Sequence, residues 1–209
     1  ECIEDSDCRL TLHTNCRNTR EIAYTSVTPL RDNRNRHPSV RTAYFWGEPV
    51  PPTLHLLADA SQQVPALNRV LDSLIAQRID HVTLLTVQTF PYSSLAPYLQ
   101  EVPDNPSLRK YPYRNRLFDV TTCIRFKGLE ADAIVLMDLR QDSFQGNGGL
   151  TFYVGASRAK FRLDMLMTLP KEEYYSLGHR LDPSFPELQN PTRMRKRLGS
   201  LFSASVVTE

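Results

Sequence analysis

A short polar turn before an apolar run holds the first residues that could do chemistry. The turn consists of Lys127, Gly128, Leu129 and Glu130. It precedes Ile134–Met137, a continuous β-rich run typical of a parallel strand buried on both faces. Glycine lets backbone N–H groups approach a ligand closely, and charges beside it lie where strand ends open onto a crevice. Such a turn can bind a phosphate, although an isolated Lys-Gly-Leu-Glu is more often an ordinary loop.

Two arginines stand where a guanidinium could reach the same kind of crevice. Arg17 follows a predicted strand, and Arg158 lies in a predicted helix beside the glycine-containing Tyr153–Ala156. Hydrolysis of a nucleoside triphosphate needs positive charge on the departing γ-phosphate, and the guanidinium is a fixed, always-charged fork. An isolated arginine more often forms a surface salt bridge, so the surrounding sequence must decide between these functions.

Three segments resemble motifs of one group of helicases. LHTNCRNTREI (Leu12–Ile22) resembles motif IV, FKGLEADAIVL (Phe126–Leu136) resembles motif V, and TFYVGASRAKFRL (Thr151–Leu163) resembles motif VI of the superfamily 1, Rep/UvrD-like helicases. All three stand in the family's order over about the length of one domain, from Leu10 to Leu169. The resemblance implies the second RecA-like domain, the C-terminal motor domain of an ATP-dependent DNA helicase or translocase.

The resemblance implies roles in nucleotide hydrolysis for five residues. Arg158 and Arg17 would contact the γ-phosphate, with Arg158 acting like an arginine finger. Gly128 would approach the phosphate with its backbone, and Glu130 would hydrogen-bond the ribose. Lys127 would belong to the same ATP-binding turn, or only brace it.

The resemblance also implies contact with single-stranded DNA. Thr122 matches the motif V threonine, which suits a contact to the phosphate backbone. Ile124 replaces a family histidine, and the neighbouring Arg125 is expected to substitute for it. Cys16 occupies the place of a tyrosine that stacks on adenine; since a cysteine cannot stack, the grip on the base would be weaker or come from a partner domain. Ser157 replaces a threonine conservatively.

The sequence lacks the other half of an ATP site. It contains no G-x-x-x-x-G-K-[ST] and no apolar run that ends in Asp-Glu. ATP and Mg²⁺ are therefore expected to be bound mainly by an N-terminal RecA-like domain of the same full-length protein. The chain by itself is expected neither to bind ATP tightly nor to hydrolyse it. Its expected partners are that domain and single-stranded DNA, without a membrane.

The composition limits the kinds of partner and compartment. The 209 residues are 41% hydrophobic, which is enough for one well-packed domain. With 25 basic and 23 acidic residues the net charge is only +2, so any basic surface must be local. One local cluster consists of Arg193, Arg195, Lys196 and Arg197. The four cysteines show no C-x-x-C spacing, which favours reduced thiols in a cytoplasmic protein and no metal site.

Alternation of apolar runs with helical patterns predicts an α/β fold. We expect one RecA-like domain with a mostly parallel sheet flanked by helices and without its own Walker A motif. The five strands expected in this sheet lie near Leu12, Leu56, Leu84, Val135 and Leu166.

Capping residues and apolar spacing predict the helices. Thr19 is expected to cap a first helix, and Ser61 a longer amphipathic one. A short helix is expected to start at Ser94, and another is expected to open at Thr151. The last of these is expected to carry Ser157, Arg158 and Lys160.

Other segments read as loops or as an extension. Residues 1–170 are expected to form the second RecA-like helicase domain without a large insertion, and 171–209 a partly irregular C-terminal extension that carries the basic cluster. Within the first, 101–116 read as irregular chain and 141–149 as a flexible glycine-rich loop. Residues 200–209 read as a linker or tail.

Two other functions remain open at this stage. The chain could be a non-catalytic nucleic-acid-binding or scaffold module that kept the RecA-like fold, since fold alone does not separate the two. The departures at Cys16 and Ile124 favour that interpretation. The joint presence of four residues favours a motor: Arg17, Gly128, Glu130 and Arg158. An RNA-directed motor of the same superfamily also fits the motifs.

Overall fold

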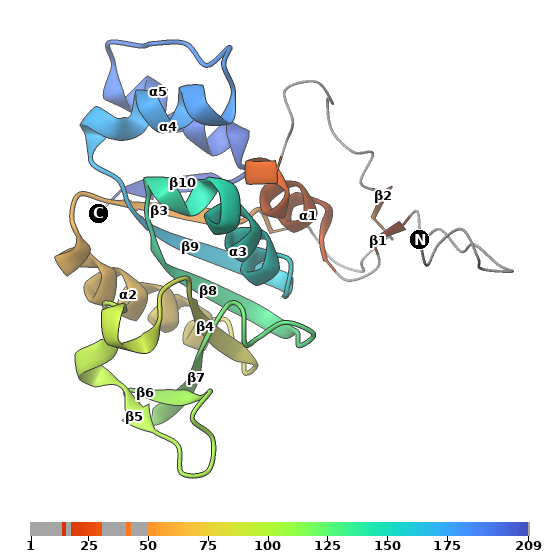
Figure 1. The fold of residues 1–209 in the computed structure, drawn as a ribbon, viewed down its shortest axis with the longest axis vertical. Coiled ribbons are helices and arrows are strands. Elements are labelled where there is room, and N and C mark those ends of the chain that lie inside the picture. The colour runs from red at the N-terminus through yellow and green to blue at the C-terminus, as the bar shows by residue number, and fades with distance from the viewer. Residues whose placement is uncertain (1–13, 16–17, 31–40, 43–49, 209) are drawn as a thin grey trace, which may run out of the picture.

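The computed structural model describes residues 14–15, 18–30, 41–42 and 50–208. The strands of the main sheet are β3 (Thr53–Leu57), β4 (Val82–Thr86), β5 (Gln100–Glu101), β6 (Arg109–Tyr113), β7 (Arg116–Thr122), β8 (Ala131–Leu139), β9 (Ala159–Thr168) and β10 (Ser205–Thr208). They form one sheet in the order β10-β3-β9-β8-β4-β7-β6-β5 (Figure 1). Neighbours from β10 to β7 run parallel, and β6 and β5 complete the sheet antiparallel.

Apolar side chains on both faces account for the position of β8 at the centre of the sheet. Ile134 and Leu136 belong to the core cluster on one face, and Val135 and Met137 to the cluster on the other. All four side chains are fully buried. Burial of one such side chain contributes about 1.5–3 kcal/mol, so this run is most stable with packed layers on both of its sides.

Helices form these two layers. They are α1 (Arg20–Ser26), α2 (Gln63–Ala76), α3 (Gly146–Ala156), α4 (Tyr174–Leu181) and α5 (Pro191–Leu201). The apolar side chains of α2 pack on one face of the sheet, and those of α1, α3, α4 and α5 pack on the other (Figure 1). None of the described helices combines the length and the apolar character that a membrane span requires.

Four of the five expected strands are confirmed in the main sheet. Leu56, Leu84, Val135 and Leu166 lie in β3, β4, β8 and β9, which are near neighbours. Leu12 lies outside the described residues. The strand expected there is therefore not tested. The described residues just after it form β1 (Thr14–Asn15), which pairs with β2 (Arg41–Thr42) in a separate two-stranded sheet.

Helix capping agrees with the prediction at α1 and differs at α2. The Thr19 hydroxyl accepts a hydrogen bond from the Ile22 N–H of α1 at 3.4 Å. Ser61 does not cap α2, because it lies in a preceding 3₁₀ turn, η2 (Ala60–Gln62), and donates its own N–H to the Asp59 carboxylate at 2.8 Å. The predicted apolar face of α2 is buried, as Leu67 shows.

Helix α3 starts earlier and ends earlier than the sequence predicts. It begins at Gly146, inside the segment that reads as a flexible loop, after the 3₁₀ turn η5 (Gln141–Phe144). A Cβ atom on Gly148 would lie 2.6 Å from the Asp142 carbonyl oxygen, so the glycines permit close packing. The helix ends at Ala156, so it carries none of the three residues predicted in it. Ser157 and Arg158 form the turn after the helix, and Lys160 lies in β9.

Prolines explain two further differences. The predicted helix at Ser94 is replaced by two 3₁₀ turns, η3 (Phe90–Tyr92) and η4 (Ala96–Tyr98), each with a proline in its first turn. The chain from 101 to 116 contains strand β6 and not only irregular chain. Pro112 is tolerated there because β6 lies near the edge of the sheet, with only the short β5 beyond it.

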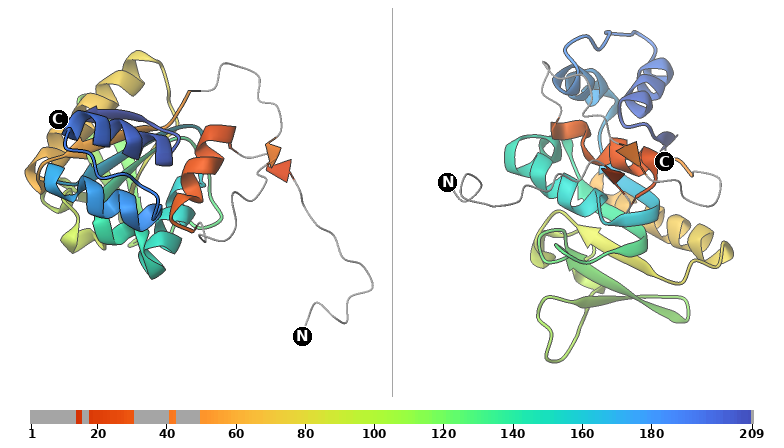
Figure 2. Two further views of the ribbon diagram at one scale, coloured as in Figure 1. Left: turned by 90° about the horizontal axis from the view of Figure 1, so that it is seen from above. Right: turned by 90° about the vertical axis from the view of Figure 1, so that its right-hand side faces the viewer.

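The last residues return to the main sheet. After β9, a 3₁₀ turn, η6 (Lys171–Glu173), leads into α4 and α5, and β10 then pairs in parallel with β3. Residues Ser205–Thr208 are therefore a strand where the sequence reads as a tail. Figure 2 shows α4 and α5 at one end of the molecule and the β6–β7 hairpin at the other.

Candidate functional site

The amino ends of β8 and β9 bring together the residues of two separate motifs. Gly128 and Glu130 come just before β8, and Arg158 comes just before β9. Strands β8 and β9 are neighbours in the sheet. The Ala131 N–H donates to the Arg158 carbonyl oxygen at 3.2 Å. Because parallel neighbours begin at the same edge, both segments lie on the amino edge of the sheet.

A third segment joins them at this edge. The Asn18 side-chain amide donates to the Ser157 carbonyl oxygen at 2.9 Å and also to that of Ala159. The Thr19 N–H donates to the Lys160 carbonyl oxygen at 3.3 Å. Asn18 is 2% exposed, so these bonds are shielded from water and hold the start of α1 against the residues around Arg158. Arg17 itself lies outside the described residues.

The turn at Gly128 needs glycine for its backbone conformation. Gly128 has φ +92°, a region that other residues rarely adopt, whereas an added Cβ atom would meet nothing within 4 Å. The turn is closed by the Leu129 N–H, which donates to the Phe126 carbonyl oxygen at 3.1 Å, and Phe126 is buried beneath it. Lys127, Gly128 and Glu130 are exposed, so open space lies above the turn.

Arg158 follows the end of α3 directly. Its N–H donates to the Gly155 carbonyl oxygen at 3.2 Å, and its Nε donates to the Val154 carbonyl oxygen at 3.3 Å. The side chain is half-buried and forms no ion pair with any residue that the structure describes. The guanidinium is therefore held near the helix end by one neutral acceptor and keeps most of its donors.

Gly155 sets how closely the end of α3 approaches the sheet. A Cβ atom at this position would lie 2.7 Å from the Cys123 sulfur and 3.0 Å from Leu136 Cδ1. The helix that leads to Arg158 thus packs directly on β8 and on the segment that follows β7. Sequence reasoning noted only that this stretch contains a glycine; the contact across 32 residues had no local signal.

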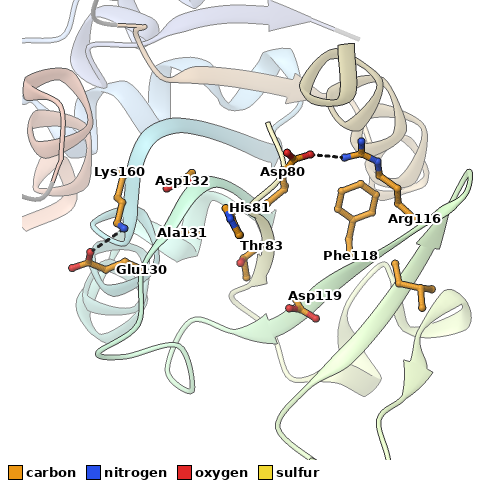
Figure 3. A pocket seen from close by; sticks show the side chains of 12 residues that line it. Asp80, His81, Thr83, Arg116, Phe118, Asp119, Glu130, Ala131, Asp132 and Lys160 are labelled. Atoms are coloured by element: carbon orange, nitrogen blue, oxygen red, sulfur yellow. Dashed lines mark hydrogen bonds and ion pairs between the residues drawn. The ribbon is translucent and has the colours of Figure 1, made fainter. Parts of the chain in front are cut away.

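Glu130 lies beside a polar cavity of about 600 Å³ at the amino ends of β4, β7 and β8 (Figure 3). Glu130 pairs with Lys160 at 3.8 Å, and Asp80 pairs with Arg116 at 3.4 Å across the opening. These pairs are exposed and contribute only about 0–1 kcal/mol each. Sequence reasoning missed this cavity because its walls come from separate strands. Among the described residues, no three carboxylate, histidine or cysteine side chains gather closely enough to hold a metal ion.

The two residues expected to contact DNA lie at the opposite edge of the sheet. Thr122 ends β7, and the next residue donates its N–H to the Thr86 carbonyl oxygen at the end of β4. Arg125 is exposed and donates to the Pro106 carbonyl oxygen at 2.9 Å. The segment 123–130 therefore runs from the carboxyl edge, where Thr122 and Arg125 lie, to the amino edge, where Gly128 and Arg158 lie.

A buried carboxylate organises the carboxyl edge. Asp138, near the end of β8, accepts hydrogen bonds from Thr86 Oγ1 at 2.7 Å, Ser93 Oγ at 2.6 Å, Ser94 Oγ at 2.6 Å and the Ser94 N–H at 3.0 Å. It lies at φ +61°, where β8 departs from regular pairing with β9. These bonds attach the segment after β4 to β8. The sequence signal was a single acidic residue at the end of an apolar run.

Cys123 lies between the two edges as an inert thiol. Burial raises its pKa to about 12, and the negative charge of Asp138 acts in the same direction. Because only the thiolate is a good nucleophile or metal ligand, Cys123 packs as a small apolar residue at neutral pH.

Comparison with known proteins shows a structural likeness without a sequence family. No protein-family model matches the chain, and no curated protein matches it either. Among solved structures, the chain is similar to the C-terminal domain of a possible DNA helicase from Lactobacillus plantarum WCFS1, with a TM-score of 0.51 and 16% sequence identity. The match covers 73% of this chain and 87% of that one. At this identity the likeness shows the fold, and it confirms the predicted α/β architecture with a mostly parallel sheet.

Proposed function

We propose that this chain is the C-terminal motor domain of an ATP-dependent DNA helicase or translocase of superfamily 1. In this proposal it completes an ATP site whose phosphate cradle and Mg²⁺ ligands belong to an N-terminal RecA-like domain. It also contacts single-stranded DNA. The structural neighbour, described as part of a possible DNA helicase, supports the general assignment.

The observation that carries the proposal is the convergence of three distant segments beside Arg158. Asn18 hydrogen-bonds the Ser157 carbonyl oxygen, and Ala131 hydrogen-bonds the Arg158 carbonyl oxygen, although these residues are far apart in the sequence. The segments are those that resemble motifs IV, V and VI. A scaffold needs no such meeting of an arginine, a positive-φ glycine and an exposed glutamate at one edge.

The geometry supports a division of roles at the amino edge. Arg158 would place its guanidinium on the γ-phosphate and stabilise the charge that develops as the phosphoryl group is transferred. The open space above Gly128 would let a backbone N–H approach a phosphate oxygen. Glu130 would accept a hydrogen bond from a ribose hydroxyl after giving up its weak pair with Lys160. Mg²⁺ would neutralise the β- and γ-phosphate oxygens from the other domain.

The carboxyl edge is the proposed path of single-stranded DNA. Thr122 and Arg125 would contact the phosphate backbone there. Residues 123–130 join this edge to the proposed nucleotide edge, so this eight-residue segment would couple DNA contact to nucleotide binding. The same surface would accept RNA, and an RNA-directed motor is the second candidate; a non-catalytic nucleic-acid-binding module is the third.

Replacement of Arg158 tests the motor function. In the full-length protein, Arg158→Ala should lower DNA-stimulated ATP turnover by about 10³–10⁵ with a modest change in nucleotide affinity. Arg158→Lys should rescue poorly, because an ammonium cannot reproduce the fork. The matched control is Arg78→Ala, an exposed arginine after α2, which should leave turnover unchanged. If Arg158→Ala retains more than a tenth of the activity while Arg78→Ala behaves as wild type, the proposed role of Arg158 is wrong.

A further inference from the structure

The outer face of α5 carries a row of cations. Arg193, Lys196 and Arg197 are exposed and stand three and four residues apart, so they share one side of the helix. Arg193 and Arg197 lie one turn apart, about 6 Å along the axis. The other exposed residues of this side, Thr192 and Ser200, are small and polar.

The inner face of α5 fixes the direction of these cations. Met194 and Leu198 are buried in the core cluster that covers this face of the sheet. A Cβ atom on Gly199 would lie 2.4 Å from Val206 Cγ2, so the helix packs directly against β10. At its start, the Asn190 side chain accepts hydrogen bonds from the N–H groups of the first turn. The helix is thus an anchored platform, and binding would not have to order it.

No carboxylate of the described residues pairs with the cations of this face. Helix α5 contains no acidic residue, and none of Arg193, Lys196 and Arg197 forms an ion pair within the described part of the chain. By contrast, at the opposite end of the sheet, Arg114 and Arg116 both pair with carboxylates. In a chain with a net charge of only +2, three such cations on one helix face are a marked local excess.

We infer that the outer face of α5 binds the phosphate backbone of a nucleic-acid duplex. Three cations on a rigid helix complement a regular row of phosphates and give affinity without sequence preference. The face has no exposed aromatic ring on which the bases of a single strand could stack. It also lacks the apolar side by which an amphipathic helix enters a lipid surface, since its apolar residues are buried in the core.

This contact goes beyond the proposed single-stranded DNA path and is separate from it. Helix α5 packs against β10 at one edge of the sheet, whereas Thr122 ends β7, five strands away. At about 4.8 Å per strand this separation is roughly 24 Å. The duplex contact depends only on charge and geometry at α5, so it can hold or fail independently of the role of Arg158.

The test is the salt dependence of duplex binding. Fluorescence anisotropy would measure the affinity of the 209-residue chain for a labelled 20-base-pair DNA duplex between 50 and 200 mM NaCl. The variant Arg193→Gln, Lys196→Gln, Arg197→Gln keeps the helix, because glutamine has good helix propensity. Each phosphate contact makes the slope of log association constant against log salt concentration more negative by about 0.9. The slope of the variant should therefore be less steep than that of the wild type by roughly 2 to 3.

A charge-matched variant provides the control. Arg78→Gln, Arg114→Gln, Arg116→Gln also removes three positive charges from exposed positions. Arg114 and Arg116 belong to the β6–β7 hairpin, and Arg78 follows α2, which packs on the face of the sheet opposite to α5. Its slope should stay within about one unit of wild type, and circular dichroism should show both variants folded. An unchanged slope in the folded α5 variant, or an equal fall in both variants, would overturn the inference. So would α5-dependent binding to vesicles of anionic lipid with no α5-dependent binding to the duplex.

Discussion

Asp138→Asn probes the network that holds the carboxyl edge together. The carboxylate is 6% exposed and accepts four hydrogen bonds, from Thr86, Ser93 and Ser94. The substitution preserves shape and, because asparagine also tolerates left-handed backbone angles, suits φ +61°. It replaces one acceptor oxygen by a donor NH₂ group and removes the negative charge, so the change isolates hydrogen bonding from packing and backbone strain.

The expected loss follows from the four bonds. A hydrogen bond to a charged group contributes about 1.5–3 kcal/mol, and a neutral one about 0.5–1.5. Losing the charge therefore costs about 1 kcal/mol per bond, and rotation of the Thr86 and Ser93 hydroxyls recovers part of this. We expect Asp138→Asn to lower the free energy of unfolding by about 3 kcal/mol. Asp138→Ala should cost about 5, because alanine in a left-handed conformation adds roughly 1–2 kcal/mol.

Urea unfolding of the 209-residue chain at pH 7 measures both changes. The transition midpoints should fall while the slope with urea stays constant, since the surface exposed on unfolding is the same. Asp132→Asn is the matched control, because Asp132 lies on the same strand but is only half-buried, and its loss should be within about 0.5 kcal/mol. If Asp138→Asn costs no more than Asp132→Asn, the buried carboxylate does not stabilise this edge and the reasoning is refuted.

Two further predictions concern the core. Burial alone would raise the pKa of Asp164, but hydrogen bonds from His55 and Arg162 outweigh burial and lower the pKa. The ionised carboxylate therefore stabilises the folded state at pH values above 3.8, the ordinary pKa of an aspartate. That stabilisation should be lost as the pH falls from 3.8 toward the lowered pKa. When the free energy of unfolding is measured against pH, Asp164→Asn should lose less stability in acid than the wild type does. The same acid dependence in both proteins would contradict this prediction. Gly155→Ala should lower the free energy of unfolding by roughly 1–3 kcal/mol, because the new methyl group overpacks against Cys123. The better helix propensity of alanine should offset about 1 kcal/mol of this loss. In a double-mutant cycle, the loss caused by Gly155→Ala should be at least about 1 kcal/mol smaller in a Cys123→Ala background. If the effects of the two substitutions are strictly additive, the contact between these residues is excluded.

The central strands could be predicted because their sequences are apolar enough to need burial on both faces. Leu56, Leu84, Val135 and Leu166 stand in short β-rich runs, and such runs are stable only between two packed layers. Turn chemistry was also local: a glycine at φ +92° and a threonine that caps α1 act within a few residues of themselves. The order of the motifs along the chain came from sequence as well.

Elements whose stability depends on distant partners could not be predicted. β10 is a short, largely exposed strand that exists because β3 offers it an edge, and β6 holds a proline at a position beyond its short pairing with β5. The glycine-rich start of α3 reads as a loop, but the same glycines let it pack on the backbone at Asp142. In each case tertiary contacts outweigh weak local preference.

The sequence by itself determined the residue types of the candidate site: a glycine turn with charges at Lys127 and Glu130, and an arginine at 158. Only the tertiary structure decided that the turn and Arg158 meet at the amino edge, and that Thr122 and Arg125 lie at the carboxyl edge. The reason is the parallel sheet, in which every crossover returns the chain to the same edge before the next strand. Residues far apart in sequence therefore become neighbours according to strand order, which no local pattern encodes.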